Sequence, residues 1–375
     1  MKLCMIGTGY VGLVSGACFS DLGNQVYCVD KDKNKIKKLN EGISPIYEPG
    51  LEDLIHTNFK SKRLIFTNNL ENAVKNSKII FICVGTPSKK GSNLVDLSQI
   101  YSVAKLISKY IKSYKIIVTK STVPLAIGDQ IEKIIGKKVR KSLFDVISNP
   151  EFLREGEAIR DFKYPDRIVI GSNNKKIFKK MELIYEPIIK KGAKFLCTSR
   201  KGAELIKYAS NAFLATKITF INEIANLCEV SGTNIEDISL GVGSDARIGS
   251  RFLRAGPAYG GSCFPKDTKG LVSIADMFKT NLSIVKSVIK SNQKRKILLT
   301  KRVEKILNNK IKNKKITVLG VTFKANTDDM RESSSLVLIP YLLKKGGIVR
   351  YYDPSGPKNE FKKNKNLKFE KTLST

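Results

Sequence analysis

The stretch Lys2–Gly12, KLCMIGTGYVG, places a short apolar run directly before the motif Gly7-Thr8-Gly9-Tyr10-Val11-Gly12. In such a motif Gly7 permits a tight turn, Gly9 lets the backbone approach a pyrophosphate, and Gly12 lets helix and strand pack closely. The helix that follows offers free N–H groups and the positive end of its dipole to phosphates. The stretch therefore predicts a dinucleotide-binding unit at the start of the chain.

An acidic residue at the end of the next apolar run supports this interpretation. Asp30 follows the run QVYCV at about the distance from the glycines where a carboxylate binds the adenosine ribose. Because a carboxylate repels the additional phosphate of NADP, Asp30 predicts NAD as the cofactor. Lys31, Lys33 and Lys35 could accommodate that phosphate, but we favour NAD because Asp30 is fixed at the end of a strand.

The first 200 residues alternate short apolar runs with amphipathic helical patterns, which predicts a parallel sheet covered by helices on both faces. The expected strands are Lys2–Ile6, Val26–Val29, Ile79–Val84, Ile116–Thr119, Val146–Ser148 and Ile168–Ile170. Thr86 and Thr122 follow two of them and are expected at the edge of the sheet where cofactors bind.

A long helical run follows, from about Arg200 to Val230, and a second covers roughly Thr268–Leu307. Near the end, KITVLG (Lys315–Gly320) and IVRYYDP, with Asp353, repeat the pattern of the N-terminus. We therefore expect an α/β protein with two Rossmann-like, doubly wound domains joined by a long central helix or helical domain, the C-terminal one being short. The expected boundaries are 1–198, 199–300 and 301–375. A helix as long as the central one suits the contact surface of a homodimer.

Composition excludes several classes of protein. The net charge of +33 invites a nucleic-acid function, but the lysines are spread along the whole chain, so we expect no nucleic-acid partner. No apolar run is long enough for a membrane span, and the N-terminus does not have the pattern of a signal peptide, so a cytoplasmic protein is expected. The seven cysteines form no CxxC pair, and His56 is the only histidine, so neither a disulfide framework nor a metal site is predicted.

Cys263 differs in context from the other cysteines, most of which lie within apolar runs. It stands in Gly260-Gly261-Ser262-Cys263-Phe264-Pro265-Lys266-Asp267, just before an expected helix. Thiolates are favoured at helix N-termini and beside lysine, so Cys263 is predicted to be a nucleophile. Lys207 and Asn211, spaced i and i+4, are expected on one face of the long helix.

The chain resembles the UDP-glucose 6-dehydrogenases, within the wider UDP-glucose/GDP-mannose dehydrogenase family, from Met1 to about Pro354. The blocks that carry the resemblance are GTGYVGL at 7–13, ISPIYEPGL at 43–51, VGTP at 84–87, KSTVP at 120–124, NPEFLREGEA at 149–158, ELIKYASNAFLATKITFINE at 204–223, RFLRAGPAYGGSCFPKD at 251–267 and LGVTFKANTDDMRESSS at 319–335.

This resemblance implies a four-electron oxidation of UDP-glucose to UDP-glucuronate that uses NAD twice. Cys263 would trap the aldehyde as a thiohemiacetal, and a second hydride transfer would give a thioester that water hydrolyses. Asp267, helped by Thr122, would activate the water, and Glu151 would assist in handling protons. Lys207 and Asn211 would stabilise the oxygen that becomes negative.

Motif and resemblance together predict three sets of site residues. The catalytic set is Cys263, Asp267, Lys207, Asn211, Thr122 and Glu151. The cofactor-binding set is Gly7, Gly9, Tyr10, Val11, Gly12, Asp30, Lys35, Thr86, Thr122, Glu155, Lys266 and Arg331. The substrate-binding set is Glu151, Phe152, Leu153, Arg154, Glu155, Lys207, Asn211, Phe252, Leu253, Arg254, Ala255, Gly256, Gly260 and Lys324.

The resemblance leaves two alternatives open. One is a dehydrogenase of another nucleotide-sugar, GDP-mannose or UDP-N-acetylmannosamine, although RFLRAG and GGSCFPKD favour UDP-glucose. The other is a catalytically weak, truncated homologue, because family members continue beyond the YDP motif with more strands and helices than are expected here.

Overall fold

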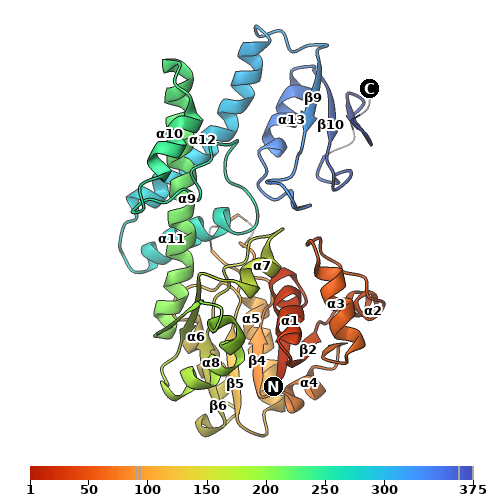
Figure 1. Ribbon diagram of the computed structural model, residues 1–375, viewed down its shortest axis with the longest axis vertical. Coiled ribbons are helices and arrows are strands. Elements are labelled where there is room, and N and C mark those ends of the chain that lie inside the picture. Colours follow the sequence, from red (N-terminus) through yellow and green to blue (C-terminus); the bar gives the residue numbers. More distant parts are fainter. Residues whose placement is uncertain (90, 93, 362–363, 374–375) are drawn as a thin grey trace. The chain divides into compact units, whose positions relative to one another are not determined.

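The structure is a computed structural model that describes residues 1–89, 91–92, 94–361 and 364–373. It divides into two compact units, Met1–Lys207 and Tyr208–Thr375. Helix α9 (Arg200–Ser231) runs without interruption through the boundary (Figure 1). This single helix confirms the long helical run expected from the sequence.

The first unit is built on one eight-stranded sheet in the order β3-β2-β1-β4-β5-β6-β7-β8. Its strands are β1 (Lys2–Ile6), β2 (Gln25–Val29), β3 (Leu64–Thr67), β4 (Ile79–Ile82), β5 (Lys115–Thr119), β6 (Phe144–Ser148), β7 (Arg167–Gly171) and β8 (Lys194–Thr198). Its helices are α1 (Tyr10–Asp21), α2 (Lys33–Asn40), α3 (Leu51–Lys60), α4 (Leu70–Asn76), α5 (Ser98–Tyr110), α6 (Ile127–Gly136), α7 (Ala158–Lys163) and α8 (Lys176–Ile189), with a 3-10 turn at Lys141–Leu143.

Alternation along the strands explains why both faces of this sheet are covered. In β1, Leu3 and Met5 pack into one core, which includes residues of α1, α3, α7 and α8. Cys4 and Ile6 point to the other side and pack with residues of α4, α5 and α6. Strands buried on both faces have nearly continuous apolar sequences, which is the pattern that marked them in the sequence.

Two details of the sheet differ from the expectation. β6 and β7 pair antiparallel, at Ser148 and Gly171, so β7 and β8 run against the other strands. The fully parallel sheet was therefore wrong at this edge, because an apolar strand has the same composition in either direction. The strands β3 and β8 were not expected.

The second unit combines helices with a small parallel sheet in the order β11-β10-β9. Its elements after α9 are α10 (Ile235–Gly243), α11 (Phe264–Met277), α12 (Ser283–Ile306), β9 (Lys315–Leu319), α13 (Ser335–Lys344), β10 (Ile348–Tyr352) and β11 (Leu367–Phe369). The single helical stretch expected over Thr268–Leu307 is two helices. Lys279, with φ of 55°, lies just beyond α11 in the left-handed conformation that commonly ends a helix.

Both sheets have an aspartate at a corresponding position, where it binds the backbone of the loop after the neighbouring strand. Asp353 follows β10 and accepts hydrogen bonds from the backbone N–H groups of Val321 and Thr322, after β9, at 2.8 and 3.3 Å. Asp30 follows β2 and accepts a bond from the N–H of Thr8, after β1, at 3.0 Å. This correspondence confirms the repeat seen in the sequence.

Candidate active site

The glycine turn after β1 has the geometry that its sequence predicts. Gly7 has φ of +98° and donates its N–H to Val29 O at 2.7 Å. A Cβ on Gly12 would lie 1.9 Å from the carbonyl oxygen of Gly7, so no larger residue fits there. At Gly9, by contrast, a Cβ would meet no atom within 4 Å. The turn is closed toward the strand and open where α1 begins, with Tyr10 and Val11 as the first residues of the helix.

Asp30 is held at the end of β2 as a carboxylate. Its Oδ2 accepts bonds from Thr8 N at 3.0 Å, Thr8 Oγ1 at 2.8 Å and Lys35 Nζ at 3.2 Å. Burial would raise the pKa of Asp30, but the bonds from Asp32 N–H and Thr8 outweigh it and lower the pKa. Since Lys35 is paired with Asp30, its charge helps to fix the acid in place.

Thr86 and Thr122 lie close together, as their positions after β4 and β5 predict. The Thr86 hydroxyl donates to the carbonyl oxygen of Thr122 at 2.9 Å. Ser121 Oγ donates to Val84 O at 2.7 Å and joins the same two loops. The carboxyl ends of neighbouring parallel strands meet at one edge of the sheet, which explains the contact.

Glu151 and Lys207 form a buried ion pair. Lys207 Nζ on α9 lies 2.9 Å from Glu151 Oε1 in the segment after β6, and the two residues are only 3% and 6% exposed. The other carboxylate oxygen accepts the N–H of Leu153 at 2.6 Å. Burial would raise the pKa of Glu151, but the charge and hydrogen bond of Lys207, together with the N–H of Leu153 and the charge of Lys120, outweigh it and lower the pKa. Glu151 is therefore ionised.

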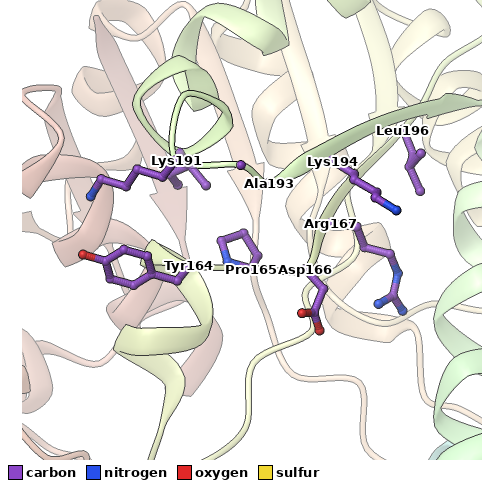
Figure 2. Close-up of a pocket in the computed structure, with 10 residues that line it drawn as sticks. Tyr164, Pro165, Asp166, Arg167, Lys191, Ala193, Lys194 and Leu196 are labelled. Atoms are coloured by element: carbon purple, nitrogen blue, oxygen red, sulfur yellow. The ribbon is translucent and has the colours of Figure 1, made fainter. Parts of the chain in front are cut away.

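The ring of Phe152 is contacted by two cations. Lys207 Nζ lies 5.3 Å from the ring centroid, and the guanidinium carbon of Arg167 lies 4.2 Å from it. Arg167 also lines a surface hollow of about 680 Å³, beside Tyr164 and Lys191 (Figure 2). None of the predicted site residues lines this hollow, so we assign it no part in the reaction.

Arg154 and Glu155 differ in their exposure to solvent. The exposed Arg154 guanidinium is bound by Asp161, with contacts of 2.6 and 2.9 Å, and by Glu157 at 2.6 Å. Glu155 is half-buried. A substrate group that bound Arg154 would therefore compete with two carboxylates of the same segment.

Cys263 stands at the head of α11, as its sequence context predicts. It is half-buried, and its Sγ lies 3.6 Å from Ser262 Oγ. The preceding Gly261 has φ of +79°, and a Cβ there would lie 2.7 Å from the ring of Phe323. The loop before the thiol is thus pressed against the segment after β9, and only glycine fits at this point.

Asp267 lies one turn further along α11 and is fully buried. Its Oδ2 accepts the Asn211 amide at 2.6 Å, and its Oδ1 is bound by Lys266 Nζ at 2.5 Å. The sequence interpretation used Lys266 as a cation that favours the Cys263 thiolate. Lys266 thus pairs with Asp267, and the N-terminus of α11 is a further feature that favours the Cys263 thiolate.

The remaining predicted substrate residues, and the predicted cofactor residue Arg331, lie in the second unit. Gly256 N–H donates to Asn222 Oδ1 at 2.7 Å and Ser239 Oγ donates to Leu253 O at 2.8 Å, which anchors the loop of Phe252, Leu253, Arg254, Ala255 and Gly256. A Cβ on Gly260 would lie 2.7 Å from Glu332 O. Lys324 Nζ lies 5.7 Å from the Phe323 ring, and Arg331 is exposed and forms a two-pronged contact with Asp329.

Comparison with known proteins identifies the family to which the chain is similar. The family of UDP-glucose/GDP-mannose dehydrogenases matches the chain with its NAD binding domain at residues 1–189, its central domain at 201–294 and its UDP binding domain at 317–375. The UDP-glucose 6-dehydrogenase of Rhizobium meliloti is 49% identical over 96% of this chain and 83% of its own length. The enzyme of the same name from Rickettsia felis is 48% identical over 98% of this chain and 82% of its length.

The chain belongs to the UDP-glucose/GDP-mannose dehydrogenase family. A solved structure of a UDP-glucose dehydrogenase from Pyrobaculum islandicum has a TM-score of 0.91 and 33% identity, over 99% of this chain and 86% of that one. Both the recognised family and the predicted fold class are thereby confirmed.

The first unit of this family member fits NAD. Gly9 leaves space beside the start of α1 and, as the N-cap residue, makes no side-chain bond to the N–H groups of that helix. These N–H groups would bind the pyrophosphate, and the ionised Asp30 would bind the adenosine ribose. The cofactor predicted from the sequence is confirmed by the match to the NAD binding domain.

Three residues of the site escaped sequence analysis. Glu48, Lys120 and Arg167 are brought to the predicted residues by folding: Glu48 contacts Tyr10, Lys120 contacts Asn149, and Arg167 stacks on Phe152. Glu48 and Lys120 do stand in blocks that carried the family resemblance, and this was the available signal. Their burial and their partners could not be read from those blocks.

The described residues contain neither a candidate membrane span nor a candidate metal site. No helix in that part of the chain is both long and apolar enough to cross a membrane. Among the same residues, no group of three or more histidine, cysteine, aspartate or glutamate side chains could hold a metal ion.

Proposed function

We propose that this protein is an NAD-dependent UDP-glucose 6-dehydrogenase that oxidises UDP-glucose to UDP-glucuronate through a thioester on Cys263. The observation that carries the proposal is the helix α11, which begins directly after Cys263 and holds the buried Asp267 one turn later. Relatives that carry this enzyme name at 49% and 48% identity support the substrate.

The residues of the chain supply a nucleophile, an oxyanion site and a base. When NAD is bound, it accepts a hydride in each of the two oxidations. The Cys263 thiolate adds to the C6 aldehyde, and the charge that moves to oxygen is stabilised by Lys207 and Asn211, one turn apart on α9. The resulting thiohemiacetal loses a hydride from C6 and becomes a thioester.

Hydrolysis then frees the thiol. Water attacks the thioester carbon, Asp267 takes a proton from the water, and the C–S bond breaks to return the Cys263 thiolate. One alcohol, two NAD⁺ and one water thus give one carboxylate, two NADH and three protons. In this scheme Glu151 holds Lys207 in place and takes part in proton transfer, and Thr122 assists Asp267.

Substrate and cofactor contacts follow the sequence prediction. We assign the nucleotide-sugar to Glu151–Glu155, Phe252–Gly256, Gly260 and Lys324. We assign the cofactor to the glycine turn, Asp30, Lys35, Thr86, Thr122, Glu155, Lys266 and Arg331. The proposed domains are 1–198 for NAD, 199–300 for the central helices and 301–375 for the UDP moiety.

We further propose that the protein is a homodimer that pairs through α9. Phe213, Phe220 and Leu227 repeat every seven residues along this helix and are 66%, 50% and 61% exposed. Apolar residues at heptad spacing form the seam between paired helices. Since NAD and UDP-glucose are metabolites of the cytoplasm, we place the reaction there.

A panel of nucleotide-sugars tests the function. Purified protein should reduce NAD in the presence of UDP-glucose, with two NADH per sugar, and should do so much less with GDP-mannose, UDP-N-acetylmannosamine or NADP. Preference for another sugar would mean that UDP-glucose is not the substrate, and efficient use of NADP would remove the role of Asp30.

The Cys263→Ser variant tests the thioester. We expect this variant to form almost no UDP-glucuronate. If it produced two NADH per sugar at the wild-type rate, a thioester on Cys263 would be excluded.

A further inference from the structure

Glu48 is a buried carboxylate that the proposed reaction does not use. It lies in the segment before α3, and only 6% of it is exposed. Its Oε2 accepts the Tyr10 hydroxyl and the N–H of Gly156 at 2.6 Å, and its Oε1 accepts the N–H of Ala158 at 2.7 Å. All three donors are neutral, so these bonds hold the carboxylate without contributing a positive charge.

These donors come from two segments with different proposed tasks. Tyr10 is the first residue of α1, within the glycine motif that would bind the pyrophosphate of NAD. Gly156 and Ala158 directly follow the segment Glu151–Glu155, which we assign to the nucleotide-sugar. The Tyr10 hydroxyl itself accepts the N–H of Gly156 at 2.9 Å, which closes the cluster. All of these residues belong to the first unit.

The chemistry of the cluster requires a carboxylate. Hydrogen bonds to an ionised acceptor are roughly twice as strong as those between neutral groups. Burial, followed by the bond to Glu48, raises the pKa of Tyr10, so its hydroxyl stays protonated and remains a donor. Glutamine would offer one acceptor oxygen and would turn an NH₂ group toward an N–H donor, so it cannot hold all three donors.

We propose that Glu48 is a positioning residue that couples NAD binding to nucleotide-sugar binding, by holding the start of α1 and the segment Glu151–Ala158 in one arrangement. This inference rests on the proposed function. A cofactor that orders Tyr10 then orders the substrate segment through Glu48 and so strengthens substrate binding. Substrate strengthens cofactor binding by the same factor, because the coupling between two binding sites is reciprocal.

The coupling can be measured without turnover. NADH and UDP-glucose do not react with each other, so the Kd of NADH can be determined by its fluorescence with and without saturating UDP-glucose. In the wild type we expect UDP-glucose to lower this Kd by roughly fivefold or more. In Glu48→Gln the factor should fall to within about twofold of one, while the Kd of UDP-glucose alone changes little.

Two further variants complete the test. Tyr10→Phe cuts the link from the other end, keeps the bonds of Glu48 to Gly156 and Ala158, and should also weaken the coupling. Glu41→Gln changes an exposed carboxylate of the same segment and should leave the factor at its wild-type value.

The proposal is overturned if the wild type shows no coupling, or if the folded Glu48→Gln protein keeps the wild-type factor. Should Glu48→Gln not fold, unchanged coupling in Tyr10→Phe overturns it. Oxidation of UDP-glucose by the wild type is measured separately. A wild type that oxidises UDP-glucose without coupling therefore refutes this inference and leaves the proposed function intact.

Discussion

Lys207 carries a buried positive charge that is compensated by Glu151 at 2.9 Å. Removing Lys207 from this ion pair would leave Glu151 as a buried, unpaired charge. Such a loss costs about 3–5 kcal/mol.

We therefore predict that Lys207→Met lowers kcat by about two to three orders of magnitude and also lowers Tm by roughly 10 °C. The double variant Lys207→Met/Glu151→Gln should regain most of the stability, because neither charge remains, but not the activity. Kinetics and thermal unfolding of both variants measure the two effects. If Lys207→Met turned over UDP-glucose at the wild-type kcat while unfolding early, Lys207 would be purely structural.

Lys120 is a second buried lysine near this pair. Its Nζ contacts two neutral acceptors, Asn149 Oδ1 at 3.3 Å and Tyr185 Oη at 3.4 Å. Burial lowers the pKa of Lys120 from 10.5 to about 8, against the opposing influence of Cys83 and Glu151, while Lys207 lowers it further. Between these two values the unfolded chain binds a proton that the folded protein has released, so stability rises with pH.

The free energy of unfolding is expected to rise by roughly 3 kcal/mol. This rise is absent below the pKa of Lys120 in the folded protein and complete above its pKa in the unfolded chain. Relative to Lys120→Met, the wild type should therefore become more stable from about pH 8 to about pH 10.5. Denaturation at several pH values gives this difference. Lys105→Met, which changes an exposed lysine, should show no such trend, and a difference for Lys120→Met that stays constant with pH would refute the prediction.

At the scale of elements, the success of the sequence analysis followed the strength of the local signal. β1, β4 and β5 each contain at least three consecutive apolar residues, and they were found because a central strand is buried on both faces. β8 was missed because it lies at one edge of the sheet and is mostly exposed, so KFLCT has no clear pattern. The reversed direction of β7 depends on pairing between distant segments, which no local pattern records.

The site shows the same division. Glycines and Asp30 were located because a local backbone requirement fixes both residue type and spacing. Lys266 was expected near Cys263 from its closeness in sequence, but its ion pair with Asp267 could not be predicted in that way. Glu48 was overlooked as a site residue because its donors come from segments about 40 and 110 positions away.

The exposed seam of α9 gives a prediction at this scale. If Phe213, Phe220 and Leu227 form a dimer contact, the double variant Phe220→Glu/Leu227→Glu should place charges in an apolar seam and separate the subunits. Light scattering after size-exclusion chromatography should give twice the chain mass of 41.8 kDa for the wild type and the mass of one chain for the variant. Met277→Glu, which changes another exposed apolar residue, serves as the control. If the double variant remained a dimer, the subunits would pair through another interface.

For the whole molecule, the net charge of +33 is the property that most affects its encounter with substrates. NAD and UDP-glucose are both anionic, so a positive field raises their local concentration and their association rates. Salt screens this field: the Debye length falls from about 30 Å at 0.01 M to about 10 Å at 0.1 M. Groups that are buried, such as Lys207 and Glu151, are screened much less.

We therefore predict that kcat/KM for UDP-glucose falls by roughly tenfold between these salt concentrations, at the lower end of electrostatic steering. Because the bound complex no longer depends on the encounter, kcat should change by less than about twofold. Steady-state kinetics in chloride and in acetate separate a general screening effect, which is the same for both salts, from binding of one particular anion. A kcat/KM that is independent of salt would mean that the positive charge, diffuse as it is along the sequence, does not contribute to substrate capture.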